Sequence, residues 1–216
     1  MSTPVYLEVG SKKVFACALD WPGWARAAKT DEGALEALAA YAGRYRAVPE
    51  AAGVRFPKSA GAELEVVERL PGSATTDFGA PDAKAAADLT PLTKPRAERM
   101  AALLEASWTV FDRVVAATPA ELRKGPRGGG RDRDKMVDHV LGAEAAYARA
   151  IGLKLRQAPL GDRAAITDVR SAILAALRAA RQPAPATGKG WPYRYAARRM
   201  SWHVLDHAWE MEDRSR

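Results

Sequence analysis

The sequence predicts a small α+β domain followed by an all-α four-helix bundle. Strand-like runs and one amphipathic helix fill the first third of the chain, whereas every long segment after Pro95 repeats its apolar residues at helical spacing. Between them lies a stretch with proline, glycine and serine that has no periodicity. We therefore expect an α+β domain over residues 1–72, a linker over residues 73–94 and the bundle over residues 95–216.

The first domain is expected to contain three strands, a helix and a last strand. VYLEV and KVFACALD are β-type runs, and Pro22 and Gly23 suit the central positions of a type II turn before a short third run, WARAA. Thr30 or Asp31 can cap the helix in TDEGALEALAAYAGRY, and AELEVVERL alternates as the last strand. This unit is near the lower size limit of an independent domain, and its residues indicate no chemistry.

Four apolar stripes predict the four helices of the bundle. The second and fourth stripes contain the histidines, and breaks at residues 125–130, 157–162 and 182–192 separate the helices. Fairly short connections of this kind favour a bundle of neighbouring helices. The first and third stripes are formed by Met100, Leu104, Trp108, Phe111 and Val115, and by Ile166, Val169, Ile173 and Leu177.

Composition narrows the classes of function. The 216 residues are 48% hydrophobic and 27% charged, which is typical of a globular protein. The only cysteine, Cys17, excludes an internal disulfide and favours a reducing compartment. No apolar run is long enough to span a membrane, so we expect a cytoplasmic protein without a membrane partner. The net charge of +7 is spread over the chain rather than gathered in one stripe, which argues against a nucleic-acid partner.

The three histidines of the chain are expected to converge in the bundle interior. His203 and His207 are four residues apart in MSWHVLDHAWEMEDR, so they lie about 40° apart on the apolar face of one helix. His139 lies in the apolar seam of the second helix, where small alanines follow it at helical spacing. All three rings should therefore point to one place from two helices.

A metal ion explains this convergence better than three separate core histidines do. A lone buried histidine is usually bonded to a carbonyl or a carboxylate, but three buried imidazoles without partners cost the desolvation of every polar nitrogen. Two histidines one helical turn apart reach the same ion, and a third from a facing helix completes the set. We expect His139, His203 and His207 to bind a divalent metal, zinc or alternatively nickel, with open positions for water or substrate.

Each residue beside the histidines has two interpretations. Glu210 and Asp206 are placed to accept hydrogen bonds from the ring nitrogens that do not bind the metal, or they pair with arginines on a solvated face. The alanines that follow the second-helix histidine leave a cavity or reflect close helix packing; they are Ala143, Ala146 and Ala150. Three tryptophans are candidates to line a substrate cleft, Trp191, Trp202 and Trp209, although the helical spacing of Trp202 and Trp209 is also typical of core residues.

The residues around the histidines carry a family resemblance. DHVLGAEAAY around His139 and RRMSWHVLDHAWEMEDR around His203 and His207 resemble the DinB-like superfamily of metal-binding four-helix bundles, over roughly residues 95–214. That superfamily includes bacillithiol- and mycothiol-dependent S-transferases and a mycothiol-dependent isomerase. The resemblance implies that the three histidines hold a divalent ion and that the protein transfers a low-molecular-weight thiol, such as mycothiol, to an electrophile. The stretch between His139 and His203 is shorter than in the better-known transferases, so the resemblance does not define the substrate pocket.

The first domain resembles a different family. ALDWPGWARAAKTDEGALEAL, in which a strand ends in a Pro-Gly turn and an acidic helix follows, is similar to HicB-like antitoxin domains over roughly residues 5–70. The bulky Trp24 after the turn departs from the usual pattern, and the helical bundle takes the place of a DNA-binding segment. The resemblance therefore implies an interaction or dimerisation module, with a homodimer as one expected assembly.

Two other functions compete with thiol transfer. In the first, the ion does no more than hold the second helix against the fourth, and the protein is a binding protein that performs no chemistry. The basic segment RKGPRGGGRDRDK at residues 123–135 could contact nucleic-acid phosphates through Arg127 and Arg131. Asp132 and Asp134 interrupt its charge, however, which indicates a solvated loop. The sequence by itself identifies no catalytic residue.

Overall fold

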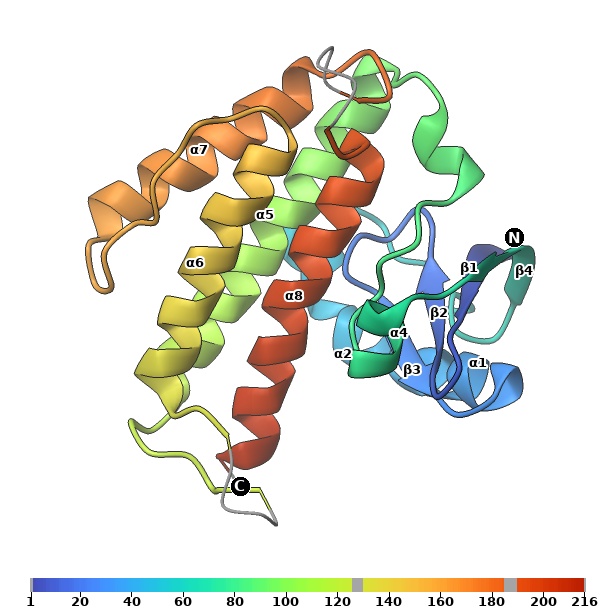
Figure 1. The fold of residues 1–216 in the computed structure, drawn as a ribbon, viewed down its shortest axis with the longest axis horizontal. Helices are drawn as coiled ribbons and strands as arrows, with labels where there is room; N and C mark the ends of the chain where they lie inside the picture. The colour runs from blue at the N-terminus through green and yellow to red at the C-terminus, as the bar shows by residue number, and fades with distance from the viewer. Residues whose placement is uncertain (1, 126–129, 185–189, 216) are drawn as a thin grey trace.

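The chain forms an N-terminal four-stranded sheet with helices, followed by a part built from four long helices (Figure 1). This computed structural model describes residues 2–125, 130–184 and 190–215. None of the helices in these ranges is both long and apolar enough to cross a membrane. The long helices are α5 (Lys94–Ala117), α6 (Arg133–Ala150), α7 (Arg163–Ala179) and α8 (Tyr193–Arg214). The preceding elements are β1 (Thr3–Val9), β2 (Val14–Ala18), β3 (Ala25–Ala28), α1 (Asp31–Ala40), α2 (Ala42–Tyr45), α3 (Ala47–Ala51), β4 (Leu64–Pro71), α4 (Ala74–Phe78) and the 3-10 helix η1 (Ala86–Leu89).

The N-terminal sheet has the strand order β3-β2-β1-β4. β1 pairs antiparallel with β2, and β2 pairs antiparallel with β3, whereas β4 lies parallel to β1. The predicted order of three strands, a helix and a last strand is confirmed, and the short helices α2 and α3 are added after α1. α1 begins where the sequence predicts, because the Thr30 hydroxyl accepts a hydrogen bond from the Gly33 amide at 3.1 Å.

The turn between β2 and β3 brings the sheet against α8. The Trp24 amide donates to the Trp21 carbonyl at 3.0 Å, and Gly23 has a φ of 92°, as a type II turn requires at its third position. A Cβ atom at Gly23 would lie 2.6 Å from Leu205 Cδ1 and 3.0 Å from Ser201 Cβ. Glycine is therefore needed here both for its backbone conformation and for the close approach of α8.

Gly23→Ala is expected to lower the free energy of unfolding by about 1–3 kcal/mol, because the methyl group would clash with α8 and L-residues avoid this backbone conformation. Gly43→Ala is the matched control, since Gly43 lies in α2 with open space around it. Chemical denaturation followed by circular dichroism measures both variants. Equal stability of the two would contradict the close packing of the turn on α8.

The segment between the sheet and the long helices packs against both of them. Residues 73–94, predicted to be a linker, carry α4 and η1. The buried carboxylate of Glu8 in β1 accepts hydrogen bonds from the Thr76 hydroxyl and from two backbone amides of this segment, the amides at 2.9 Å. In η1, the fully buried carboxylate of Asp88 forms a bidentate ion pair with Arg198 of α8, and its Oδ2 atom lies 2.6 Å from Arg198 Nη2. These contacts tie the sheet to α8.

α8 is the central element of the structure (Figure 1). One side of α8 packs with α5 and α6 in the core of the long helices, and another side adds Leu205 and Trp209 to a core shared with the sheet and α1. Trp202 joins a third apolar cluster on the other face of the sheet. The side of α8 that belongs to none of these three clusters carries half-buried polar residues, which are Arg199, Asp206, His207 and Glu210.

The face of α6 that meets the core differs from the predicted one. Its buried residues are Met136, Val140, Leu141, Glu144, Ala145 and Ala148. The predicted seam is wrong, since Ala146 is exposed and Ala143 and Ala150 are only half-buried. The orientation of α6 is set by its neighbours: Glu144 turns inward to an ion pair with Arg170 of α7 at 3.1 Å. His139 consequently lies at the edge of the helical core, half-buried, rather than in its middle.

Candidate metal centre

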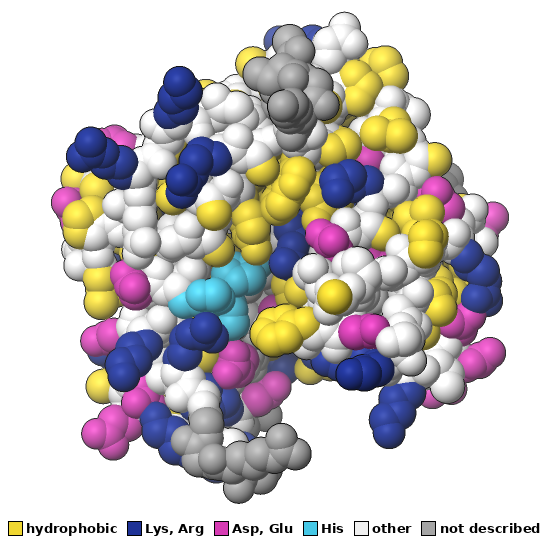
Figure 2. Space-filling model, in the orientation of Figure 1, with side chains coloured by type: hydrophobic (Ala, Val, Ile, Leu, Met, Phe, Trp, Pro, Cys, Tyr) yellow, Lys and Arg dark blue, Asp and Glu magenta, His cyan; other side chains and the backbone are white. Residues whose placement is uncertain are grey.

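Three imidazole rings meet between α6 and α8 (Figure 2). His139 comes from α6, and His203 and His207 come from successive turns of α8. The Nε2 atoms of His139 and His203 are 3.1 Å apart, and one nitrogen from each ring lies within 4.8 Å of the others. The ring centroids are 4.7–5.0 Å apart. The structure thus brings together the three residues that the sequence singles out.

The carboxylate of Glu210 orients the ring of His207. Its Oε2 atom lies 3.1 Å from His207 Nδ1, and its Oε1 atom accepts a hydrogen bond from Arg214 at 2.8 Å. Because the carboxylate engages Nδ1, Nε2 is the nitrogen of His207 that is left to bind an ion. Both interpretations of Glu210 are therefore met, since it contacts the His207 ring and also pairs with Arg214. Such carboxylate–imidazole pairs orient metal-binding histidines in many proteins.

Asp206 fits the second of its two interpretations, a carboxylate paired with an arginine, and not the first. Its carboxylate forms an ion pair with Arg26 of β3 at 3.2 Å instead of a hydrogen bond with His203. The two partners are 180 residues apart in the chain, so the contact exists only because β3 lies beside α8. Burial raises the pKa of the Asp206 carboxyl, and the charge of Arg26 opposes that shift.

The surroundings keep two of the three rings neutral. Burial lowers the pKa of His203 to about 2, and the charges of the neighbouring histidines and of Arg199 add to the shift. Burial also lowers the pKa of His139, with the charge of Arg131 as the next cause. A neutral imidazole keeps a nitrogen lone pair free, which is the form that binds a metal ion. Both rings are therefore in the ligating form at neutral pH.

The nitrogen positions fit a divalent ion such as zinc. Two nitrogens bonded at about 2.0–2.1 Å to one tetrahedral ion lie about 3.3 Å apart. The Nε2 atoms of His139 and His203 are already at 3.1 Å. The widest separation in the set is at most 4.8 Å, so a small rotation of one ring would close the site. Three imidazole ligands leave coordination positions for water or a substrate.

Aromatic side chains border the centre toward the beginning of α8. The ring of Tyr147 lies 5.7 Å from that of His203 and 5.1 Å from that of Trp191. The ring of Trp202 lies 6.4 Å from that of His203. Trp202 is therefore near His203, but it is also buried in an apolar cluster, so it fits the core interpretation as well; Trp191 is linked to the centre only through Tyr147. Trp209 is buried in the core.

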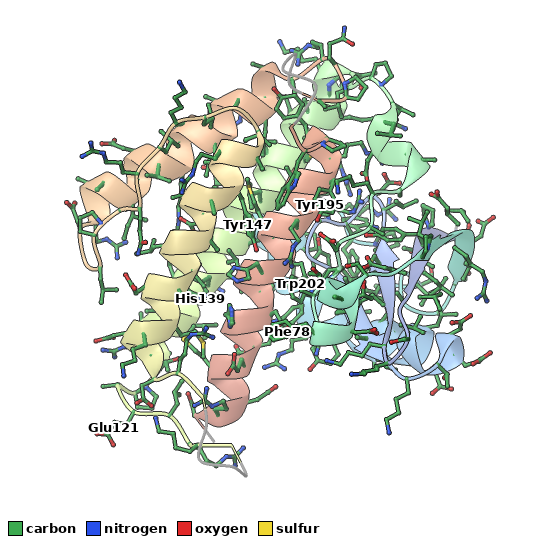
Figure 3. All side chains as sticks on the ribbon, viewed as in Figure 1. Phe78, Glu121, His139, Tyr147, Tyr195 and Trp202 are labelled. Atoms are coloured by element: carbon green, nitrogen blue, oxygen red, sulfur yellow. The ribbon has the colours of Figure 1, made fainter. Side chains whose placement is uncertain are left out.

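A hollow in the surface separates the histidines from α4 (Figure 2). Phe78 at the end of α4 is 87% exposed, and Figure 3 shows it on the side of α4 that is turned toward α8 and Trp202. Neither Phe78 nor Tyr147 was predicted from the sequence to belong to the site. Tyr147 follows His139 by eight residues, so helical spacing could have placed it beside the centre. Phe78 lies in an aperiodic segment, and only the fold brings it here.

The basic segment between α5 and α6 is engaged in contacts within the protein. Of its two proposed phosphate contacts, Arg127 lies outside the described residues and Arg131 is exposed. Arg123 Nη2 donates to the Asp213 carbonyl at 3.0 Å, and Lys124 forms an ion pair with Asp132. These contacts hold the described residues of the loop against the end of α8 and against one another, and they reduce the free positive charge that a phosphate would need.

Comparison with protein-family models, with curated proteins and with solved structures finds no match to this chain. The DinB-like and HicB-like resemblances therefore stay predictions from the sequence. Any function must be argued from the histidine centre and its surroundings.

Proposed function

We propose that the protein is a metal-dependent enzyme of the DinB-like type, which binds a divalent ion, zinc or alternatively nickel, at His139, His203 and His207. The observation that carries this proposal is the convergence of three imidazole nitrogens from α6 and α8 within 4.8 Å. The chain has only three histidines, and all of them are in this cluster. Neighbouring imidazoles that are buried or half-buried, as these are, lose hydration unless something uses their nitrogen lone pairs, and a divalent ion does so.

The reaction that we infer is the transfer of a low-molecular-weight thiol, such as mycothiol, to an electrophile. A divalent ion at this centre would supply the positive charge that lowers the pKa of a bound thiol. Glu210 would hold the His207 ring in one orientation, and Trp191, Trp202 and Tyr147 would exclude water from one side. The electrophile would reach the centre along the hollow between the histidines and α4.

The proposal extends to the rest of the chain. The four long helices would be the metal-binding four-helix bundle of that superfamily, and the N-terminal sheet would be a HicB-like interaction or dimerisation module. A cytoplasmic location would suit a thiol substrate, because that compartment keeps thiols reduced. The buried free thiol of Cys17, whose pKa burial raises to about 12, is unreactive and takes no part in the proposed reaction.

Thiol transfer by the purified full chain tests this proposal. We expect the zinc-loaded protein to conjugate mycothiol or bacillithiol to a chlorodinitrobenzene-type acceptor, followed by the absorbance of the thioether product. Chelation should abolish turnover and added zinc should restore it, because the neutral thiol is a poor nucleophile. One equivalent of bound metal with no turnover for either thiol would contradict the transferase and favour an ion that only fastens α6 to α8.

A further inference from the structure

A small cavity separates α8 from the sheet beside the histidine centre. Its volume is about 10 Å³, room for one water-sized group. Aromatic and apolar side chains, several of them from β1 and β2, form most of its wall, and Arg198 and Arg199 of α8 complete it. Trp202 also lines the cavity, and its ring lies 6.4 Å from that of His203. Trp202 is therefore a neighbour of both the cavity and the proposed metal centre.

Two guanidinium groups of this wall hold hydrogen-bond donors that lack acceptors. Nη1 of Arg199 is buried and has no hydrogen-bond partner among the described residues. Nε of Arg198 is also buried and makes no hydrogen bond of good geometry there, with the Tyr6 side chain beside the same guanidinium, its ring centroid 5.3 Å from Cζ. Buried N–H groups are nearly always paired in native proteins, because an unpaired one loses its hydration without compensation. Both unpaired donors belong to residues of one cavity, so its occupant should be a hydrogen-bond acceptor.

The charge of Arg199 is not balanced within the part of the chain that the structure describes. The buried guanidinium of Arg198 has the carboxylate of Asp88 as its partner. Arg199 stacks on Trp202 instead, with Cζ 4.7 Å from the ring centroid, and none of the described carboxylates pairs with it. A water molecule in the cavity would satisfy the N–H groups but leave this charge uncompensated. An anionic acceptor would satisfy both.

Arg199 and the histidines lie on the same open side of α8. Arg199 precedes His203 by one helical turn, and Tyr147 bridges them: its ring is 5.7 Å from the His203 ring and 5.7 Å from Arg199 Cζ. Figure 2 shows a basic side chain in the hollow next to the histidines, and Figure 3 places Tyr147 and Trp202 along it. A molecule with its anionic end at Arg199 would extend past these two rings toward the histidines.

We propose that this cavity receives one oxygen of a carboxylate group of the substrate. One carboxylate oxygen would accept hydrogen bonds from Arg198 Nε and Arg199 Nη1, and the flat or apolar body of the molecule would lie against Trp202 and Tyr147. Arg199 is then the residue that determines specificity for small organic acids. The inference rests on the proposed function for what happens to the substrate, but carboxylate binding at Arg199 needs no ion.

Benzoate binding to the full chain tests the subsite. Isothermal titration calorimetry on chelator-treated protein removes any direct bond between the carboxylate and a metal, and benzamide is the uncharged analogue of similar shape. We expect saturable benzoate binding by the wild-type protein, binding weaker by about tenfold or more in Arg199→Gln, and partial recovery in Arg199→Lys. Benzamide should bind the wild-type protein no better than benzoate binds Arg199→Gln.

A matched control separates this site from the net charge. Arg113→Gln removes the same charge from an exposed position on α5 and should leave benzoate affinity unchanged. Equal benzoate affinity of the wild-type and Arg199→Gln proteins, or no saturable benzoate binding, would overturn the subsite. Zinc uptake by the same proteins is measured separately. Benzoate binding without zinc uptake would disprove only the proposed function, and zinc uptake with no effect of Arg199→Gln on benzoate would disprove only the subsite.

Discussion

The His203→Ala variant is expected to bind zinc about 1000-fold or more weakly than the wild-type protein. The substitution removes the ring whose Nε2 lies 3.1 Å from that of His139, and a site with two imidazoles left cannot close around the ion. Competition titration against a chromophoric chelator measures the affinity, and elemental analysis of the purified chain gives the stoichiometry. Circular dichroism of the metal-free variant shows whether the fold is retained.

Two carboxylate variants sharpen this test. Glu210→Gln should weaken zinc binding by about 10–100-fold, because Glu210 orients the His207 ring through its contact at 3.1 Å. Asp206→Asn is the control: Asp206 is paired with Arg26, so its loss should leave zinc affinity unchanged. Wild-type zinc affinity in His203→Ala, or equal effects of the two carboxylate variants, would show that the rings do not share an ion in the arrangement described.

Replacing Asp88 with alanine is expected to lower the free energy of unfolding by about 3–5 kcal/mol, since it leaves the buried guanidinium of Arg198 without its partner. Both side chains are almost completely buried, with 0% of the Asp88 side chain and 7% of the Arg198 side chain exposed. Asp88 also accepts a hydrogen bond from the Ala85 amide at 2.8 Å, which the variant loses. Chemical denaturation followed by circular dichroism measures the change.

Two further variants show whether burial of an unpaired charge is the cause. Asp134→Ala removes a carboxylate that is 60% exposed in its pair with Arg133, and should cost no more than about 1 kcal/mol. Combining Asp88→Ala with Arg198→Met removes the unpaired charge and should recover a large part of the lost stability. Equal stability of the Asp88→Ala and Asp134→Ala proteins, or a double variant no more stable than Asp88→Ala, would contradict this account.

Local patterns were enough to predict much of the secondary structure. The strand runs, the Thr30 cap and the turn at Gly23 depend on residues close together in the chain, and each is present in the structure. The same holds within α8, where a spacing of four residues places His203 and His207 on neighbouring turns whatever surrounds the helix. The contact between Glu210 and His207 is likewise a neighbour relation along one helix.

The rotation of a helix about its own axis depends on contacts with other segments, and a local sequence pattern does not contain these contacts. Glu144 of α6 faces inward and pairs with Arg170, so the alanines that were predicted to form the seam lie at the edge of the helical core. Asp206 pairs with an arginine of β3 instead of contacting His203. The unpaired donors of Arg198 and Arg199 likewise arise from the packing of α8 on the sheet.

By itself, the sequence determined the succession of strands and helix along the first part of the chain, the breaks between the long helices and which three residues carry the candidate chemistry. Only the tertiary structure decided the partners of the charged side chains and the shape of the space beside the histidines. The physical reason is that periodicity sets angles within one helix, whereas burial and ion pairing depend on the free energy of contacts between segments far apart in the chain.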